Sequence, residues 1–240
     1  MTRPAPQTAA AALIEARYPE CDAAFMAGSI VRGEGTATSD IDLVVITTRP
    51  EAPFRESLVF ERWPVEAFVH SEESARRYFQ MDAKDRRPML PMMCAEGLIL
   101  RDRDGAASRI KAEAQALLDA GPAPLTPEER DNYRYALTDQ LDDLEGCDRP
   151  DELLYIAPEL AALAAEFLLA FNGRWVSRGK WIPRSLGRYD PVLAARLTAA
   201  LEAVYRTGER DQLVAFVDAV LAPAGGRLFA GYHRAGQPEA

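Results

Sequence analysis

Two carboxylates at the start of an apolar run constrain this chain more than any other feature. Asp40 and Asp42 flank Ile41 and lead into residues 43–46, Leu-Val-Val-Ile, a run typical of a buried strand. Side chains of a strand alternate between its two faces, so both carboxylates are expected on one side. Two carboxylates fixed on one face can bind Mg²⁺, which proteins commonly hold with a few carboxylates and the phosphates of a substrate.

A glycine and a serine precede these acids at the end of another apolar run. Residues 23–27 read as a short buried strand, and Gly28-Ser29 ends it. Such a turn lets backbone N–H groups and a hydroxyl approach a phosphate, and a helix starting there adds a positive dipole. The sequence therefore predicts a strand, a phosphate-binding turn and a carboxylate pair, in this order.

The segment from Gly28 to Asp42 resembles the signature of the DNA polymerase beta-like nucleotidyltransferase superfamily. That signature is Gly-Ser, a spacer, and then Asp-x-Asp at the start of a strand. The resemblance implies a third carboxylate on a neighbouring strand, and residues 65–69 supply Glu66. Glu61 is also near, but it reads as lying on the turn side of a hairpin, so Glu66 is the better candidate.

The resemblance also implies roles for these residues. Asp40, Asp42 and Glu66 would be both the catalytic residues and the metal ligands, with Mg²⁺ as cofactor and ATP as nucleotide donor. Contacts to the nucleotide are expected from the same segment, at Gly28, Ser29, Arg32 and Ser39.

Charge limits the partners of the chain. The formal net charge is −9, whereas proteins that bind a polynucleotide backbone usually carry a basic patch. The arginines are scattered among acids, with short clusters at Arg86-Arg87 and residues 101–103. We therefore expect no nucleic acid as partner, while the resemblance implies a nucleoside triphosphate and a small-molecule acceptor. The oligomeric state stays open.

The first half of the chain is expected to alternate helices and strands. The expected helices cover residues 9–17, a short segment after Ser29, 71–85 and 105–120. Strands are expected at residues 23–27, 41–47, 56–62, 65–70 and 97–102, with a hairpin around Trp63-Pro64. The predicted fold class is α+β, a nucleotidyltransferase domain in which a small mixed sheet carries helices on one face and the acids on the other.

A Pro- and Gly-rich linker at residues 121–124 separates two expected domains, 1–120 and 121–240. The second domain reads as an all-α bundle of four or five helices. Thr126, Pro127 and Glu129 form a helix start with a capping box. Residues 153–171 are apolar almost all round, which predicts a helix at the bundle centre, and residues 191–207 and 210–221 supply two more.

A polar loop, residues 172–184, interrupts this bundle. Its residues 179–184 resemble a Gly-Lys-x-x-Pro-Lys-like segment of the aminoglycoside adenylyltransferases, with Arg184 in place of the last Lys. The resemblance implies that Lys180 or Arg184 reaches the triphosphate, whose charge cations offset during transfer. The alternative is a solvated basic loop with Trp175 and Trp181 packed against the bundle.

The remaining features point to a cytoplasmic protein. Cys21, Cys94 and Cys147 are odd in number and widely spaced, so we expect free or buried thiols. The first residues lack the pattern of a signal peptide. No stretch of about twenty apolar residues is recognised, so no membrane span is expected.

Together these features predict transfer of a nucleoside monophosphate, AMP from ATP, to a hydroxyl of a small molecule such as an aminoglycoside-like antibiotic. One alternative is an enzyme that modifies (AMPylates) a protein hydroxyl. Another is a non-catalytic nucleotide-binding or antitoxin-type module, against which the intact acid triad and the length of 240 residues argue. An acidic stretch over residues 139–148 is either a solvated helix face or a lining that attracts a cationic acceptor. His70 is expected to be structural.

Overall fold

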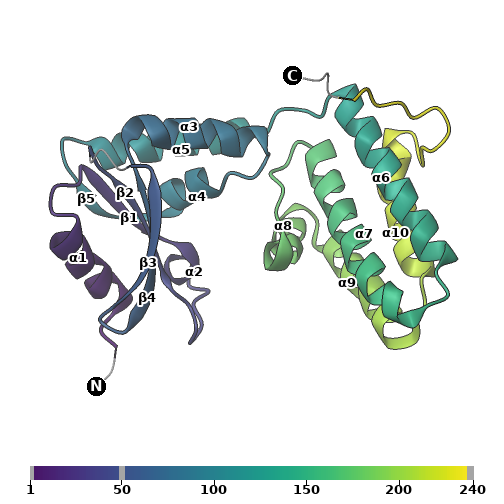
Figure 1. The fold of residues 1–240 in the computed structure, drawn as a ribbon, viewed down its shortest axis with the longest axis horizontal. Coiled ribbons are helices and arrows are strands. Elements are labelled where there is room, and N and C mark those ends of the chain that lie inside the picture. The colour runs from purple at the N-terminus through teal and green to yellow at the C-terminus, as the bar shows by residue number, and fades with distance from the viewer. Residues whose placement is uncertain (1–2, 49–51, 237–240) are drawn as a thin grey trace. The chain divides into compact units, whose positions relative to one another are not determined.

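The computed structural model describes residues 3–48 and 52–236. The chain divides into two compact units, Met1–Gly121 and Pro122–Ala240 (Figure 1). The first unit contains a mixed sheet with helices, and the second contains helices and turns. This architecture confirms the predicted fold class.

The first unit is built on one sheet, which has five strands in the described part of the chain. They are β1 (Ala23–Ala27), β2 (Ile41–Ile46), β3 (Phe54–Phe60), β4 (Trp63–His70) and β5 (Leu98–Asp102), in the spatial order β3-β4-β2-β1-β5. Strands β2 and β4 are parallel, and the other neighbours are antiparallel. The parallel register places Glu66 directly beside Asp42.

Helices cover both faces of this sheet, not one face as the sequence suggested (Figure 1). Helix α1 (Pro6–Arg17) packs on one face, while α3 (Glu72–Lys84), α4 (Met89–Glu96) and α5 (Ala106–Ala120) pack on the other. Both faces need a cover because β1 is buried along its whole length. Along β2, Leu43 faces α1, whereas Val44 faces the other three helices.

The acids therefore do not face away from the helices as expected. Asp42 lies two residues before Val44 on β2, so its side chain projects from the same face of the sheet, the one that α3, α4 and α5 cover. We call this the acid face and the opposite one the α1 face.

The β3–β4 hairpin turns at Glu61-Arg62, not at Trp63-Pro64. Glu61 and Arg62 have φ values of 47° and 71°, the left-handed conformation that two-residue hairpin turns require. Trp63 already pairs with Phe60. Pro64 is tolerated in β4 because the pairing with β2 begins only at the next residue. Helix α4, between α3 and β5, is a further element that the sequence pattern did not predict.

The second unit contains five α-helices within the described residues. They are α6 (Pro127–Gly146), α7 (Pro150–Phe171), α8 (Ile182–Tyr189), α9 (Pro191–Thr207) and α10 (Asp211–Leu221), with short 3₁₀ turns η1 (Gly179–Trp181) and η2 (Ala222–Ala224). The capping box of α6 is confirmed, since Thr126 and Glu129 exchange hydrogen bonds of 3.1 and 2.8 Å. The predicted loop ends earlier than expected, because Arg184 lies within α8.

Helix α7 combines an apolar composition with a length of 22 residues. By length and composition alone this helix could cross a membrane, since its most apolar window has a mean hydropathy of 1.7. The expectation that the chain has no stretch of this kind is therefore wrong. Half of that window is buried inside the structure, and Glu166 within the helix accepts a hydrogen bond of 2.8 Å from Tyr133. Core helices of soluble bundles share these properties.

Candidate active site

Gly28 follows β1 directly, is the first residue of the short helix α2 (Gly28–Val31) and lies against Asp42. Its φ of +80° lies in the left-handed region, which favours glycine. A Cβ atom at this position would lie 1.9 Å from Oδ2 of Asp42. Any larger residue would therefore have to displace the Asp42 carboxylate.

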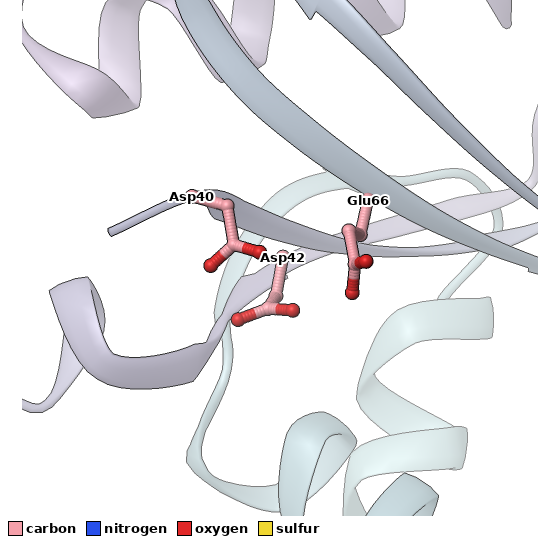
Figure 2. A group of neighbouring side chains, drawn as sticks. All are labelled: Asp40, Asp42 and Glu66. Atoms are coloured by element: carbon pink, nitrogen blue, oxygen red, sulfur yellow. The ribbon is translucent and has the colours of Figure 1, made fainter. Parts of the chain in front are cut away.

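Asp40, Asp42 and Glu66 form one acidic cluster, as predicted from the sequence (Figure 2). Each offers one carboxylate oxygen, and these oxygens all lie within 4.8 Å of one another. Asp42 lies at the start of β2 and Asp40 just before it, while the parallel pairing with β4 brings Glu66 alongside. Figure 2 shows the three side chains projecting to the same side of the sheet.

The electrostatics of the cluster suit a divalent cation. Burial, together with the charges of Asp40 and Glu66, raises the pKa of Asp42 from 3.8 to about 6. A divalent cation would offset this repulsion, and Mg²⁺ prefers oxygen ligands of this kind. The cluster is half-buried, which leaves a path for an ion from solvent. The donor set therefore fits the metal that the sequence predicted.

Two arginines partly balance the negative charge, and both lower the pKa of Asp42. Arg32, at the end of α2, pairs with Glu34 at 3.4 Å and with Glu96 at 3.2 Å. Arg55, on β3, donates from Nη2 to Oε2 of Glu66 at 2.6 Å.

Sequence reasoning missed Arg55 because it misplaced the hairpin turn. A turn at Trp63-Pro64 would set Glu61 opposite Glu66. The observed register instead sets Ser57 opposite Glu66 and places Arg55 diagonally across from it. A turn placed at Glu61-Arg62 would have revealed the ion pair.

Ser29 and Ser39, both predicted to contact the nucleotide, lie together beside the cluster. Their hydroxyl oxygens are 3.2 Å apart, and Ser39 also accepts a hydrogen bond of 2.8 Å from the backbone N–H of Thr36. These bonds hold the loop before β2 against α2. Contacts of either serine with a nucleotide stay a prediction.

Lys180 and Arg184 belong to the second unit and share one aromatic neighbour. Lys180 Nζ lies 5.9 Å and Arg184 Cζ 4.5 Å from the centre of the Trp181 ring. Lys180 is exposed and Arg184 is half-buried. Both side chains therefore lie near the face of an indole ring, a contact that the sequence did not predict. Their role toward a triphosphate stays a prediction.

His70 and the cysteines have structural surroundings. Burial and the nearby charge of Arg77 lower the pKa of His70 to about 4, so this imidazole is neutral at pH 7. Its Nδ1 is 3.3 Å from the Ser74 hydroxyl oxygen. Its ring packs edge-on against the Tyr78 ring, with 4.9 Å between the two ring centres. The three cysteines, Cys21, Cys94 and Cys147, are buried free thiols, as expected.

Comparisons with known proteins agree with this geometry. Residues 14–88 match the family model of the nucleotidyltransferase domain, a range that includes Gly28 and all three acids. Among solved structures, the chain is similar to a nucleotidyltransferase-like protein from Exiguobacterium sibiricum, with 13% identity and a TM-score of 0.48, over 91% of this chain and 75% of that one. No curated protein gives a significant sequence match. The first unit of this chain thus contains a segment, residues 14–88, that matches a nucleotidyltransferase domain.

Proposed function

We propose that this protein transfers a nucleoside monophosphate, AMP from ATP, to a hydroxyl group of a small molecule, with Mg²⁺ as cofactor. The observation that carries the proposal is the convergence of Asp40, Asp42 and Glu66 beside the Gly28 turn, inside a matched nucleotidyltransferase domain. Three oxygen ligands beside a turn that can accept phosphate are what a metal–nucleotide complex requires.

Each residue of the cluster has a defined task in this reaction. Asp40, Asp42 and Glu66 would hold the cation, which when bound would withdraw charge from the triphosphate and favour loss of pyrophosphate. The acceptor oxygen forms a bond to the α-phosphorus while the bond to the departing pyrophosphate breaks. Glu66 takes the proton of the acceptor hydroxyl on a carboxylate oxygen that the cation leaves free.

Candidate contacts to the nucleotide come from two segments of the sequence in this proposal. Backbone N–H groups of the Gly28-Ser29 turn bind the phosphates, with Arg32 and the Ser39 hydroxyl near them. Lys180 and Arg184 offset the charge of the triphosphate. Support for these two cations is the short sequence resemblance and their solvent-accessible positions.

A cationic acceptor agrees best with the charge of the chain. The net charge is −9, and five acids on or just after α6 are exposed: Asp139, Asp142, Asp143, Glu145 and Asp148. Arg227 pairs with Glu145 at 2.6 Å, which offsets part of this charge. Arg227 also reaches Asp142 at 3.8 Å, and the acids stay exposed to solvent, where they would attract a polycation such as an aminoglycoside.

The test is a transfer assay with labelled nucleotides. Purified protein is incubated with Mg²⁺, each α-labelled nucleoside triphosphate, and a panel of aminoglycosides, lincosamides and cell lysate. We expect label on a small molecule together with release of pyrophosphate, with ATP as the preferred donor. Label on a protein band would instead support protein AMPylation. Absence of pyrophosphate with every acceptor would contradict the proposal and favour a binding module.

A further inference from the structure

Arg55 binds an acid that the proposed function assigns to the cation. It projects from β3 on the acid face, opposite Phe68 in the strand register. From there its guanidinium reaches diagonally to Glu66, with Nη2 2.6 Å from Oε2. The same guanidinium lies over the Phe68 ring, with Cζ 4.8 Å from the ring centre. These two contacts fix the charged end of Arg55 at the edge of the acidic cluster.

The second arginine near the cluster, Arg32, is held differently. Its guanidinium pairs with Glu34 and Glu96, neither of which belongs to the cluster. Arg55 instead pairs with Glu66, a member of the cluster itself. The side chain of Arg55 is 56% exposed and that of Glu66 is 27% exposed, so solvent can take up the guanidinium if it leaves.

A guanidinium and a divalent cation compete for the same carboxylate, since each bears positive charge and each needs an oxygen lone pair. We propose that Arg55 is the counter-ion of Glu66 in the metal-free protein, and that a divalent cation displaces it from Oε2. Arg55 thereby lowers the cation affinity of the cluster. This inference rests on the proposed function, because it takes the cluster as the cation site.

The inference is tested by calorimetric titration of the nucleotide-free protein with Mn²⁺, which measures the affinity for the cation. The variants are Arg55→Met, which removes the charge and keeps a long side chain, and Arg55→Lys, which keeps the charge. Arg17→Met is the matched control, because Arg17 pairs with Glu56, the next residue along β3, which lies on the α1 face. It removes the same charge from the same unit.

We expect Arg55→Met to bind Mn²⁺ roughly three- to tenfold more tightly than wild type, since a partly solvated like charge is removed. Arg55→Lys and Arg17→Met should stay close to the wild-type affinity. Because Arg55 is exposed, thermal unfolding should show little change, and Arg55→Gln is a second neutral replacement should Arg55→Met not fold.

Two results would overturn the inference while leaving the proposed function in place. Unchanged affinity in Arg55→Met would show that the ion pair does not oppose the cation. Weaker binding would show that Arg55 positions Glu66 for the cation instead of competing with it. A wild-type protein that binds no Mn²⁺, with or without ATP, would contradict the cation site itself and therefore both proposals.

Discussion

The two faces of the sheet use the same strands for opposite purposes. On the α1 face, Leu43 and Val45 of β2 join an apolar core with Leu13 of α1. A charged group on that face, Glu56, accepts hydrogen bonds from both Arg17 and Tyr18. On the acid face, the same β2 begins with Asp42, whose pKa is raised by burial and by like charges. Both faces have an apolar core, but the acid face also gives up stability where it holds like charges close together.

This difference depends on the strict alternation of side chains along β2. Asp42 and Leu43 are adjacent in sequence and lie on opposite faces. A shift of the register by one residue would bury the carboxylate under α1 and expose the leucine among the acids. Buried apolar neighbours thus fix the positions of charged groups that repel one another.

The largest expected effect is that of Asp42→Asn on the acid face. Magnesium-dependent transfer should fall at least about 100-fold, because a metal ligand is lost. The metal-free protein should at the same time become more stable at pH 8, by about 1–3 kcal/mol. The folded state raises the pKa of Asp42 to about 6, so ionising this carboxylate above pH 6 destabilises folded wild-type protein. The asparagine variant avoids this loss. The difference in unfolding free energy between variant and wild type should therefore disappear as the pH falls to about 4, where the carboxyl group is protonated. Urea unfolding between pH 4 and 8 measures it.

The control for this variant is Glu61→Gln, which removes one negative charge from the exposed hairpin turn of the same unit. It should change neither the transfer rate nor the pH dependence of unfolding. If Asp42→Asn were no more stable than wild type at pH 8, the acid face would hold no electrostatic strain.

The opposite face is tested by Leu13→Ala, which opens a cavity under α1. Leu13 is 2% exposed, so the variant should lose about 2–5 kcal/mol of unfolding free energy. Activity per folded molecule should be unchanged, since no polar group of the acid face is altered. Urea unfolding and a transfer assay at low temperature measure the two quantities. Loss of activity in fully folded protein would show that the faces are not separable.

Gly28→Ala tests the contact between the turn and the acid face. The new Cβ would press on the Asp42 carboxylate, so we expect a loss of about 1–3 kcal/mol in stability together with weaker Mn²⁺ binding. Gly33→Ala is a matched control, because Gly33 also has a positive φ of 73° but would meet nothing within 4 Å. It should lose stability through backbone strain alone and keep the cation affinity. Equal Mn²⁺ binding in both variants would remove Gly28 from the site.

A further prediction concerns Lys180, which lies outside the sheet and its two faces. If Lys180 contacts the triphosphate, Lys180→Ala should weaken ATP binding by about 1.5–3 kcal/mol, the range for a charge-assisted hydrogen bond. The loss should shrink for AMP, which lacks the β- and γ-phosphates. Calorimetric titration of both ligands against wild type and variant decides between the two cases. Equal ATP affinities would assign Lys180 to the solvated surface.

The acidic cluster could be predicted because it depends on local rules. The spacing of Asp40 and Asp42, and the apolar residues after them, indicates a strand face without knowledge of its neighbours. Glu66 required one further step, a neighbouring strand, which the family resemblance supplied. The cover on both faces could not be derived in this way, since it depends on which helices pack where.

The pairing of Arg55 with Glu66 was out of reach for a related reason. It depends on the hairpin register, and Pro64 predicts a turn at Trp63-Pro64 because proline is common in turns. The actual turn uses Glu61 and Arg62 in a left-handed conformation, which is uncommon for these residue types. With the turn at the wrong residues, the sequence could not predict that the Arg55 guanidinium pairs with Glu66.

The most direct test of the cation site is a crystal of the protein grown with Mn²⁺ and a non-hydrolysable ATP analogue. Anomalous diffraction locates manganese independently of the protein atoms. We predict an anomalous peak bound by carboxylate oxygens of Asp40 and Asp42, with Glu66 in its coordination sphere or bonded to a ligand of the ion. A nucleotide bound with manganese elsewhere, or with no manganese among these three carboxylates, would contradict the account.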